Sequence, residues 1–244
     1  MFLDEIEIKE GAFFISDAHD NEKRDGFYLF LKKLDAKEIV APQLFLMGDM
    51  FDLLVGEVSY TKELFKESIT LINKISEKIE IFYFEGNHDF DLQSVFPDVK
   101  VFPISLQPFC FRYRDKKILL SHGDLYQGFG YTLYTAIIRN KISLKILDFI
   151  DNSTKNFISK KILTPQIGKN ICYEIENFEK IIKQKLQKYD IGITEIDFVF
   201  EGHHHQDKEF VFGELKYKNF SSFACDKSYY KITFEDEIKF IKIS

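Results

Sequence analysis

Five short apolar runs in this chain each end in a loop that carries Asp, Asn or His, and no other feature of the sequence constrains the fold as strongly. Residues 44–47 have the composition of a buried strand, and Gly48 allows the backbone to turn at its end. Asp49 and Asp52 follow in that turn, three residues apart. Open α/β folds place their binding sites beyond the carboxyl ends of the strands. The pattern therefore predicts an α/β fold whose polar site lies at one edge of a sheet.

The other four runs repeat this arrangement along the chain. They occupy residues 12–15, 79–84, 117–120 and 198–200. The polar segments that follow them are Ser16-Asp17-Ala18-His19, Gly86-Asn87-His88-Asp89, Ser121-His122-Gly123-Asp124 and Gly202-His203-His204-His205. Apolar residues at helical spacing predict helices over 26–34 and 59–78. Alternating apolar residues in the tail predict antiparallel strands at 210–212, 229–232 and 238–243.

Composition sets the outer limits of the prediction. A chain of 244 residues with 45% apolar residues can bury one sizeable core, with room for a small cap. The formal net charge of -6 argues against nucleic acid as the main partner. The N-terminal stretch lacks the features of a secretory signal, and no run of about 18 apolar residues predicts a membrane helix. Cys110, Cys172 and Cys225 are odd in number and widely spaced, so we expect no disulfide framework and a cytoplasmic location.

Residues 125–163 interrupt the alternation of strands and polar loops with a helical pattern. Six basic and two acidic residues give this stretch a charge of about +4, which leaves about -10 on the rest of the chain. One interpretation of this stretch is an ordinary pair of solvated helices. The other, which explains the pattern equally well, is a cap that receives a substrate both apolar and anionic, such as a lipid phosphate at a membrane surface. In such a cap, Tyr126, Tyr131, Tyr134 and Arg139 are candidate substrate contacts, and structural roles are the alternative for the tyrosines.

The polar segments together contain the ligands of a two-metal site. Hydrolysis of phosphoesters by two divalent cations requires ligands that hold the ions about 3.5–4 Å apart, with a carboxylate bridging them. Groups suited to this are present in Asp17, His19, Asp49, Asn87, His122, His203 and His205. Oxygen and imidazole ligands without thiolate suit Mn, Fe or Zn better than an all-oxygen Mg or Ca cage. The strand ends therefore predict a two-metal hydrolase.

These segments resemble the five ordered motifs of the calcineurin-like metallophosphoesterases. The motifs are Asp17-Ala18-His19, Gly48-Asp49-Met50-Phe51-Asp52, Gly86-Asn87-His88-Asp89, His122-Gly123-Asp124 and Gly202-His203-His204-His205. The match keeps both the order and the strand-end placement from about residue 11 to residue 205. The resemblance implies an αββα metallophosphoesterase sandwich, with its core at 1–124 and 191–244 and a helical cap insertion at 125–190.

The resemblance also implies which residues bind each ion. The first ion would be bound by Asp17, His19, Asp49 and His205. The second would be bound by Asp49, Asn87, His122 and His203, so that Asp49 bridges the pair. Two divalent ions, Mn²⁺ by preference, would supply a metal-bridging hydroxide that attacks the phosphorus in line. His204 points the other way in an extended segment, so we expect it not to bind metal.

Further residues of the motifs have roles in the family besides metal binding. His88 and Asp52 correspond to a catalytic pair in which Asp52 orients His88 and favours its charged form, so that His88 protonates the leaving oxygen. The alternative for His88 is a hydrogen bond within its own loop. Asp89 and Asp124 are expected to fix loops rather than to bind metal.

Three features are similar to the UDP-2,3-diacylglucosamine hydrolases of lipid A synthesis. The second motif continues to Gly56-Glu57, Phe90 follows Asp89, and a basic helical insertion follows the fourth motif. The similarity implies cleavage of UDP-2,3-diacylglucosamine at its pyrophosphate to UMP and 2,3-diacylglucosamine 1-phosphate. It also implies a peripheral enzyme at the cytoplasmic face of the inner membrane, in which Asn87 contacts the substrate as well as a metal ion.

Two departures leave other functions open. His88 stands where that subfamily usually has Arg, and Gln206-Asp207 stand in place of its usual Arg-Pro after the fifth motif. Another phosphodiesterase or phosphatase of the family, acting on a nucleotide or a phosphoprotein, is therefore the alternative. A metal-free scaffold of the same fold is a third hypothesis, which is disfavoured because none of the seven expected ligands is missing.

Overall fold

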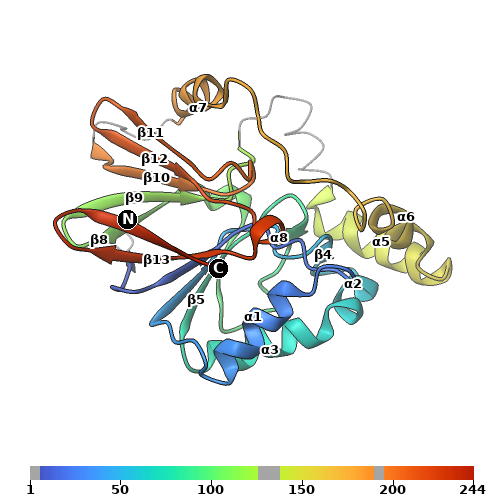
Figure 1. The fold of residues 1–244 in the computed structure, drawn as a ribbon. Helices are drawn as coiled ribbons and strands as arrows, with labels where there is room; N and C mark the ends of the chain where they lie inside the picture. Colours follow the sequence, from blue (N-terminus) through green and yellow to red (C-terminus); the bar gives the residue numbers. More distant parts are fainter. Residues whose placement is uncertain (1–5, 126–137, 190–194) are drawn as a thin grey trace.

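The computed structural model describes residues 6–125, 138–189 and 195–244, and two six-stranded sheets face each other in it (Figure 1). The first sheet, in spatial order, contains β1 (Ile6–Glu7), β8 (Phe109–Tyr113), β9 (Lys116–Ser121), β10 (Phe198–Glu201), β12 (Leu215–Asn219) and β11 (Lys208–Phe212). The second contains β14 (Ile238–Ile243), β13 (Tyr229–Phe234), β2 (Phe13–Ile15), β3 (Gln43–Leu46), β5 (Glu80–Phe84) and β7 (Lys100–Phe102). A separate two-stranded sheet pairs β4 (Leu54–Val55) with β6 (Asp89–Phe90).

The central strands of the second sheet are buried on both faces, which explains why they are apolar without alternation. β2, β3 and β5 are parallel neighbours. Phe14, Phe45 and Phe82 extend from these strands into the space between the sheets, where neighbouring rings stack with centroids 4.4 and 4.6 Å apart. Their chain neighbours, such as Leu44 and Leu46, point to the opposite face and pack under helices. Continuous apolar runs of this kind are typical of parallel strands covered on both sides.

Helices cover the outer face of each sheet and complete four layers. α1 (Gly26–Asp35) and α3 (Lys66–Ser76) lie against the second sheet (Figure 1). α7 (Phe178–Leu186) packs on the first sheet, where it buries Ile182. The predicted αββα sandwich is confirmed. α7 lies within the range 125–190 that we expect to form the cap, whereas the structure makes it the fourth layer of the core.

Among its described residues, the rest of that range contains a pair of helices beside the core. They are α5 (Lys141–Ser153) and α6 (Phe157–Leu163). α5 rests on α2 (Ser59–Leu64), where the Ser59 amide donates a hydrogen bond of 2.7 Å to the Asp148 carboxylate. Leu144 of α5 is buried in a small apolar cluster with Val58 and Phe90. Among the helices described, none combines the length and the apolarity that crossing a bilayer requires.

Other elements differ from the sequence prediction. The helix expected over 59–78 is divided into α2 and α3 at Phe65, which leaves helical geometry and buries its ring. A 3₁₀ turn, η1 (Ile104–Leu106), precedes β8. The sequence prediction omits β8, although Phe109, Phe111 and Tyr113 alternate with Cys110 and Arg112 in the pattern that indicates a strand. The short helix α8 (Phe223–Asp226) also follows a segment without apolar periodicity.

The expectation of no disulfide is wrong. Cys172 and Cys225 form a disulfide, with Cα atoms 5.8 Å apart, and Cys110 does not take part in it. The two bonded cysteines are 53 residues apart in sequence. The segment between α6 and α7 lies beside α8 only after the sheets have formed, so spacing along the chain does not indicate this pairing.

Candidate metal centre

The carboxyl ends of parallel strands from both sheets meet at one edge of the sandwich. β2, β3 and β5 are parallel in the second sheet, and β9 and β10 are parallel in the first. Each of these strands is followed within three residues by one of the polar segments predicted to bind metal. The site is therefore assembled from loops that rigid strands position, at the edge where α/β sheets generally bind ligands.

Asp49, directly after β3, occupies the centre of this site. Its backbone adopts a left-handed conformation (φ 52°), and its carboxylate is buried. One carboxylate oxygen accepts a hydrogen bond of 2.8 Å from the His88 amide, and the other lies 3.4 Å from His122 Nε2. Gly86 makes room for this carboxylate, since a Cβ at that position would lie 2.1 Å from Asp49 Oδ1. Any larger residue would displace the group that is expected to bridge the ions.

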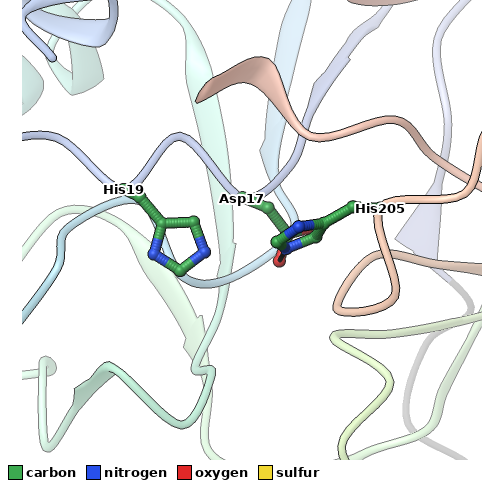
Figure 2. Close-up of side chains that lie close together, drawn as sticks. All are labelled: Asp17, His19 and His205. Carbon is green, nitrogen blue, oxygen red and sulfur yellow. Dashed lines mark ion pairs between the residues drawn. The ribbon is translucent and has the colours of Figure 1, made fainter. Parts of the chain in front are cut away.

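The first potential ligand group comprises Asp17, His19 and His205 (Figure 2). One ligand atom from each lies within 4.8 Å of the other two. Asp17 Oδ1 lies 3.1 Å from His205 Nε2, and both Asp17 oxygens accept hydrogen bonds from the His203 amide. His205 Nδ1 donates to the Ile171 carbonyl at 2.9 Å, which turns Nε2 toward Asp17. A hydrogen bond of this kind fixes which imidazole nitrogen is available to a metal.

The second group comprises Asp49, His122 and His203, from the loops after β3, β9 and β10. His122 Nδ1 donates to the Met47 carbonyl at 2.9 Å and leaves Nε2 facing Asp49. A third set, His19, Asp49 and His88, connects the two groups, so Asp49 has ligand atoms of both within reach. The structure thus brings together six of the seven expected ligands, and it places Asn87 next to His88 at the mouth of a cavity.

Buried polar atoms without partners indicate that cations fit here. His19 Nε2, His122 Nε2 and Asn87 Oδ1 are buried and have no hydrogen-bond partner among the described residues. Leaving such atoms unsatisfied costs about 1–3 kcal/mol each, so their presence at one site calls for a ligand. The available donors are imidazole nitrogens and carboxylate or amide oxygens, which suit Mn, Fe or Zn. The residues present therefore fit two divalent cations.

The electrostatics of the site keep its carboxylates ionised. Burial alone would raise the pKa of Asp17, but the adjacent His205 lowers it to about 2. Burial would also raise the pKa of Asp49, but the nearby histidines, chiefly His122, hold it well below the usual range. In return, Asp49 raises the pKa of His122 well above its usual value, against the effect of burial. A cation binding at this site therefore competes with a proton for the imidazole nitrogen.

The expected pairing of the Asp52 carboxylate with His88 is not found. That carboxylate lies 3.3 Å from His19 Nδ1 and accepts hydrogen bonds from Arg24 at 3.0 Å and Asn21 at 2.6 Å. His88 Nδ1 instead donates to the backbone carbonyl of Asp52 at 2.8 Å. The pairing differs because the turn after β3 directs the Asp52 side chain toward the loop of β2. Asp52 therefore holds His19 in place, and its carbonyl orients His88.

Asp89 fixes the loops, as expected. Its carboxylate accepts hydrogen bonds from the amides of Asp49, Met50 and Gly86 and from the Tyr83 hydroxyl. Burial, reinforced by the nearby Asp49, raises the pKa of Asp89 to about 7. His204 lies outside the ligand groups, with its ring 5.2 Å from that of Phe178.

The sequence did not predict the buried contacts that support the loops of His122 and His203 on the side of α7. Glu201, at the end of β10, is fully buried and accepts hydrogen bonds from Lys185, Tyr217, Ser121 and Tyr189. The Lys185 ammonium group also donates to the Gly123 carbonyl at 2.6 Å. Lys185 therefore joins the loops of His122 and His203 from α7. A single acidic residue at the end of an apolar strand is the signal in the sequence that indicates such a network.

The predicted substrate contacts have different outcomes. Arg139 donates to the Gly86 carbonyl at 2.7 Å, and its guanidinium group stacks over Phe90 at 4.9 Å. Tyr126, Tyr131 and Tyr134 lie outside the described residues. Arg139 also lines a cavity of about 390 Å³ that begins at Asn87 and His88 and extends under the cap. The apolar residues that line this cavity are Leu53, Val55, Val58, Phe90, Ile138, Leu144, Leu147, Ile158 and Ile162.

This chain is similar to several known proteins. A curated UDP-2,3-diacylglucosamine hydrolase from Pseudomonas putida is 29% identical over 153 residues, which cover 61% of this chain and 63% of that protein. One from Wigglesworthia glossinidia brevipalpis is 26% identical over 215 residues, covering 84% of this chain and 83% of that protein. A solved phosphoesterase from E. coli is 15% identical, with a TM-score of 0.44, over 95% of this chain and 97% of that one.

The family is identified more directly. The family model described as calcineurin-like phosphoesterase matches residues 12–207, a range that contains all the strand-end motifs. The match to the Pseudomonas relative spans less than two thirds of that protein, and the identity is modest. The chain belongs to the calcineurin-like phosphoesterase family.

Proposed function

We propose that this protein is a two-metal phosphoester hydrolase that cleaves the pyrophosphate of UDP-2,3-diacylglucosamine, producing UMP and 2,3-diacylglucosamine 1-phosphate. The observation that carries the proposal is the apolar cavity that begins at His88 and Asn87 and continues between the core and the cap. A substrate with both a pyrophosphate and acyl chains matches a polar site that opens directly into an apolar cavity. The names of the relatives in Pseudomonas and Wigglesworthia support the same substrate.

The ligand groups define what the site does in the reaction. Two divalent cations, Mn²⁺ by preference, supply charge stabilisation at the phosphoryl group and a nucleophile derived from water at neutral pH. Asp17, His19 and His205 would hold one ion, and Asp49, His122 and His203 would hold the other. Asn87 would complete the second set. The buried carboxylates and the exclusion of water strengthen each of these electrostatic contacts.

His88 acts on the leaving group in this proposal. The Asp52 carbonyl accepts a hydrogen bond from Nδ1, so this nitrogen carries the proton and Nε2 is free to face the substrate. His88 also lines the cavity, which places its ring between the ligand groups and the space for the acyl chains. A protonated Nε2 at this point delivers a proton to the oxygen that departs from phosphorus.

The outer surface of the cap supports a position at the membrane. Ile142, Ile146 and Phe149 lie on one face of α5, and their side chains are 71%, 56% and 74% exposed. Lys141 and Lys145 flank this apolar face. An exposed apolar stripe bordered by basic residues is typical of helices that lie at the surface of an anionic bilayer. We therefore place the cap against the cytoplasmic surface of the inner membrane, where the lipid substrate is dissolved.

The test is turnover of the lipid substrate by Mn²⁺-loaded protein. UDP-2,3-diacylglucosamine in mixed micelles should yield UMP, and UDP-glucosamine without acyl chains should be cleaved much more slowly. A small chromogenic phosphodiester serves as the control for an intact metal site. Absence of UMP together with rapid hydrolysis of the small diester would reject the lipid substrate and favour a nucleotide or phosphoprotein substrate. Inactivity toward every phosphoester in Mn²⁺-loaded protein would reject the hydrolase itself.

A further inference from the structure

A strap of residues 164–177 connects α6 to α7 (Figure 1). It contains no helix or strand, and within it only Ile171 is buried. Backbone groups of the strap bond to the site: Arg24 donates to the Gln166 carbonyl at 2.9 Å, and His205 donates to the Ile171 carbonyl at 2.9 Å. The strap is thus an irregular segment with a direct contact to an expected metal ligand.

The disulfide ties this strap to the opposite side of the same ligand group. Cys172 directly follows Ile171, whose carbonyl sets the orientation of His205. Cys225 belongs to α8, which is bound to the loop after β2: the Ala224 amide donates to the Asp17 carbonyl at 3.2 Å. Two more hydrogen bonds hold the start of α8, from the Phe223 amide to the Ser16 carbonyl and from the Ser222 hydroxyl to the Asp17 carbonyl. One covalent bond therefore fixes the Ile171 carbonyl relative to Asp17.

We propose that the thiol–disulfide state of Cys172 and Cys225 controls how tightly the group Asp17, His19 and His205 binds its metal ion. The inference rests on the proposed metal-dependent function of the site. In the oxidised protein the strap holds His205 Nε2 within 3.1 Å of Asp17. In the reduced protein the Ile171 carbonyl is no longer covalently tied to α8, so His205 spends less time in the orientation that binds metal.

The cysteines are placed for such a reaction. Both Cys172 and Cys225 are exposed, so a thiolate can approach either sulfur. A dithiol supplies the two electrons and two protons: the Sγ–Sγ bond breaks, both cysteines become thiols, and the dithiol becomes a disulfide. A small disulfide such as oxidised glutathione reverses the step by thiol–disulfide exchange and leaves as two thiols.

The expected effect is a weakening rather than a loss of the site. After reduction the strap still has hydrogen bonds to Gln206, through the Tyr173 carbonyl and the Ile175 amide. In the second ligand group, the Asp49 carboxylate accepts from the His88 amide and His122 Nδ1 donates to the Met47 carbonyl, and neither of these hydrogen bonds involves the strap. Loss of a partner that orients a metal-binding imidazole generally lowers affinity by about 10- to 100-fold. We expect a decrease of about tenfold at one of two Mn²⁺ sites.

Titration with Mn²⁺ in both redox states of the full chain tests the inference. The oxidised protein, with only Cys110 reactive toward a thiol reagent, is compared with protein reduced by a dithiol and desalted without oxygen. Calorimetry should show one site about tenfold weaker after reduction, and oxidised glutathione should restore it. Equal Mn²⁺ affinities in the two states would overturn the inference and leave the metal centre intact. Absence of Mn²⁺ binding in both states would overturn the inference together with the proposed function.

Variants separate the disulfide from other effects of reduction. Cys172→Ser should bind Mn²⁺ as the reduced protein does and no longer respond to the dithiol. Cys110→Ser is the matched control and should keep the full response, because Cys110 is not in the disulfide. His205→Ala should be weak in both states, since the strap then has no imidazole to orient. A redox response of the same size in Cys172→Ser or in His205→Ala would contradict the inference. The comparison of oxidised and reduced wild-type protein stands even where a variant fails to fold.

Discussion

The loops of the metal centre and the helices of the cap are held in opposite ways. Asp17, Asp49 and His122 are at most 2% exposed, and each is bound by backbone groups of neighbouring loops. In the cap, α5 leaves Ile142 and Phe149 more than 70% exposed and rests on α2 through few polar contacts. Overlapping contacts fix the position of each catalytic group, whereas the cap retains apolar surface that is available to bind something else. Under the proposed function, the core carries out the chemistry and the cap selects the substrate.

The largest expected effect is at the centre of the core. Asp49→Ala should lower kcat/KM for a small phosphodiester by on the order of 10³-fold or more, because Asp49 belongs to the second ligand group and also to the set with His19 that connects the two groups. Elemental analysis of the purified variant should show a loss of both metal ions. Asp98→Asn, on the exposed surface, is the control and should have normal activity. Full activity in Asp49→Ala would disprove the bridging role.

A smaller loss is expected at the boundary between core and cavity. His88→Ala should reduce kcat by about 10²- to 10³-fold while metal content is unchanged, because His88 is assigned to proton transfer. The loss should be greatest for esters with a poor leaving group and small for p-nitrophenolate, which departs without a proton. Equal losses for both classes of ester would show that His88 has another role.

The buried ion pair between Lys185 and Glu201 is expected to contribute to stability. Burial opposes ionisation of Glu201, and the Lys185 ammonium group is the main reason why the pKa of Glu201 is nevertheless lowered. Lys185→Met removes that partner from the fully buried carboxylate. Breaking a buried ion pair in this way costs about 3–5 kcal/mol in the free energy of unfolding, which denaturant titration measures. The double variant with Glu201→Gln should recover much of this loss. If Lys185→Met alone were as stable as the wild type, this ion pair would not be what supports these loops.

A substitution in the cap is expected to affect the diacyl substrate and not small phosphodiesters. Leu144→Asp puts an unpaired charge into the apolar cavity and should lower cleavage of the diacyl substrate by about 10- to 100-fold. Hydrolysis of a small phosphodiester should be unchanged. Leu106→Asp, at an exposed position in the core, is the control. If both substrates were affected equally, the cap could not be assigned to substrate choice.

The smallest effect concerns the outer face of α5. Replacing Ile146 and Phe149 together by Ser should weaken binding to anionic vesicles by about tenfold in a sedimentation assay. Activity toward a soluble phosphodiester should remain at the wild-type level. Vesicle binding equal to that of the wild type would contradict the proposed membrane contact.

The sequence was informative where buried strands end in polar loops. Runs that are buried on both faces, as at Phe45 and Phe82, leave a continuous apolar pattern that marks each strand and the loop after it. Glycines also point to close approaches: a Cβ at Gly202 would lie 2.0 Å from the Ser16 hydroxyl. The α/β class and the grouping of most expected ligands at one edge follow from these local signals, whereas the αββα arrangement was implied by the family resemblance.

Contacts between distant segments were not predictable in this way. The Asp52 carboxylate faces His19 because of the direction of one turn, and the disulfide depends on where the strap passes α8. Lys185 reaches Glu201 across a helix–sheet interface: helical periodicity places it on the buried face of α7 with Phe178 and Ile182, but does not identify its partner. Each of these depends on tertiary placement, which a single sequence does not encode in any local pattern.

The two-sided character of α5 has a consequence for how a lipid would travel. Leu144 faces the cavity while Phe149 faces outward, so only the width of one helix, about 10 Å, separates the two surfaces. Under the proposed function, an acyl chain leaving the bilayer crosses that short distance without being exposed to bulk water. The lipid would then leave the bilayer and bring its phosphate to the metal centre in one movement around α5.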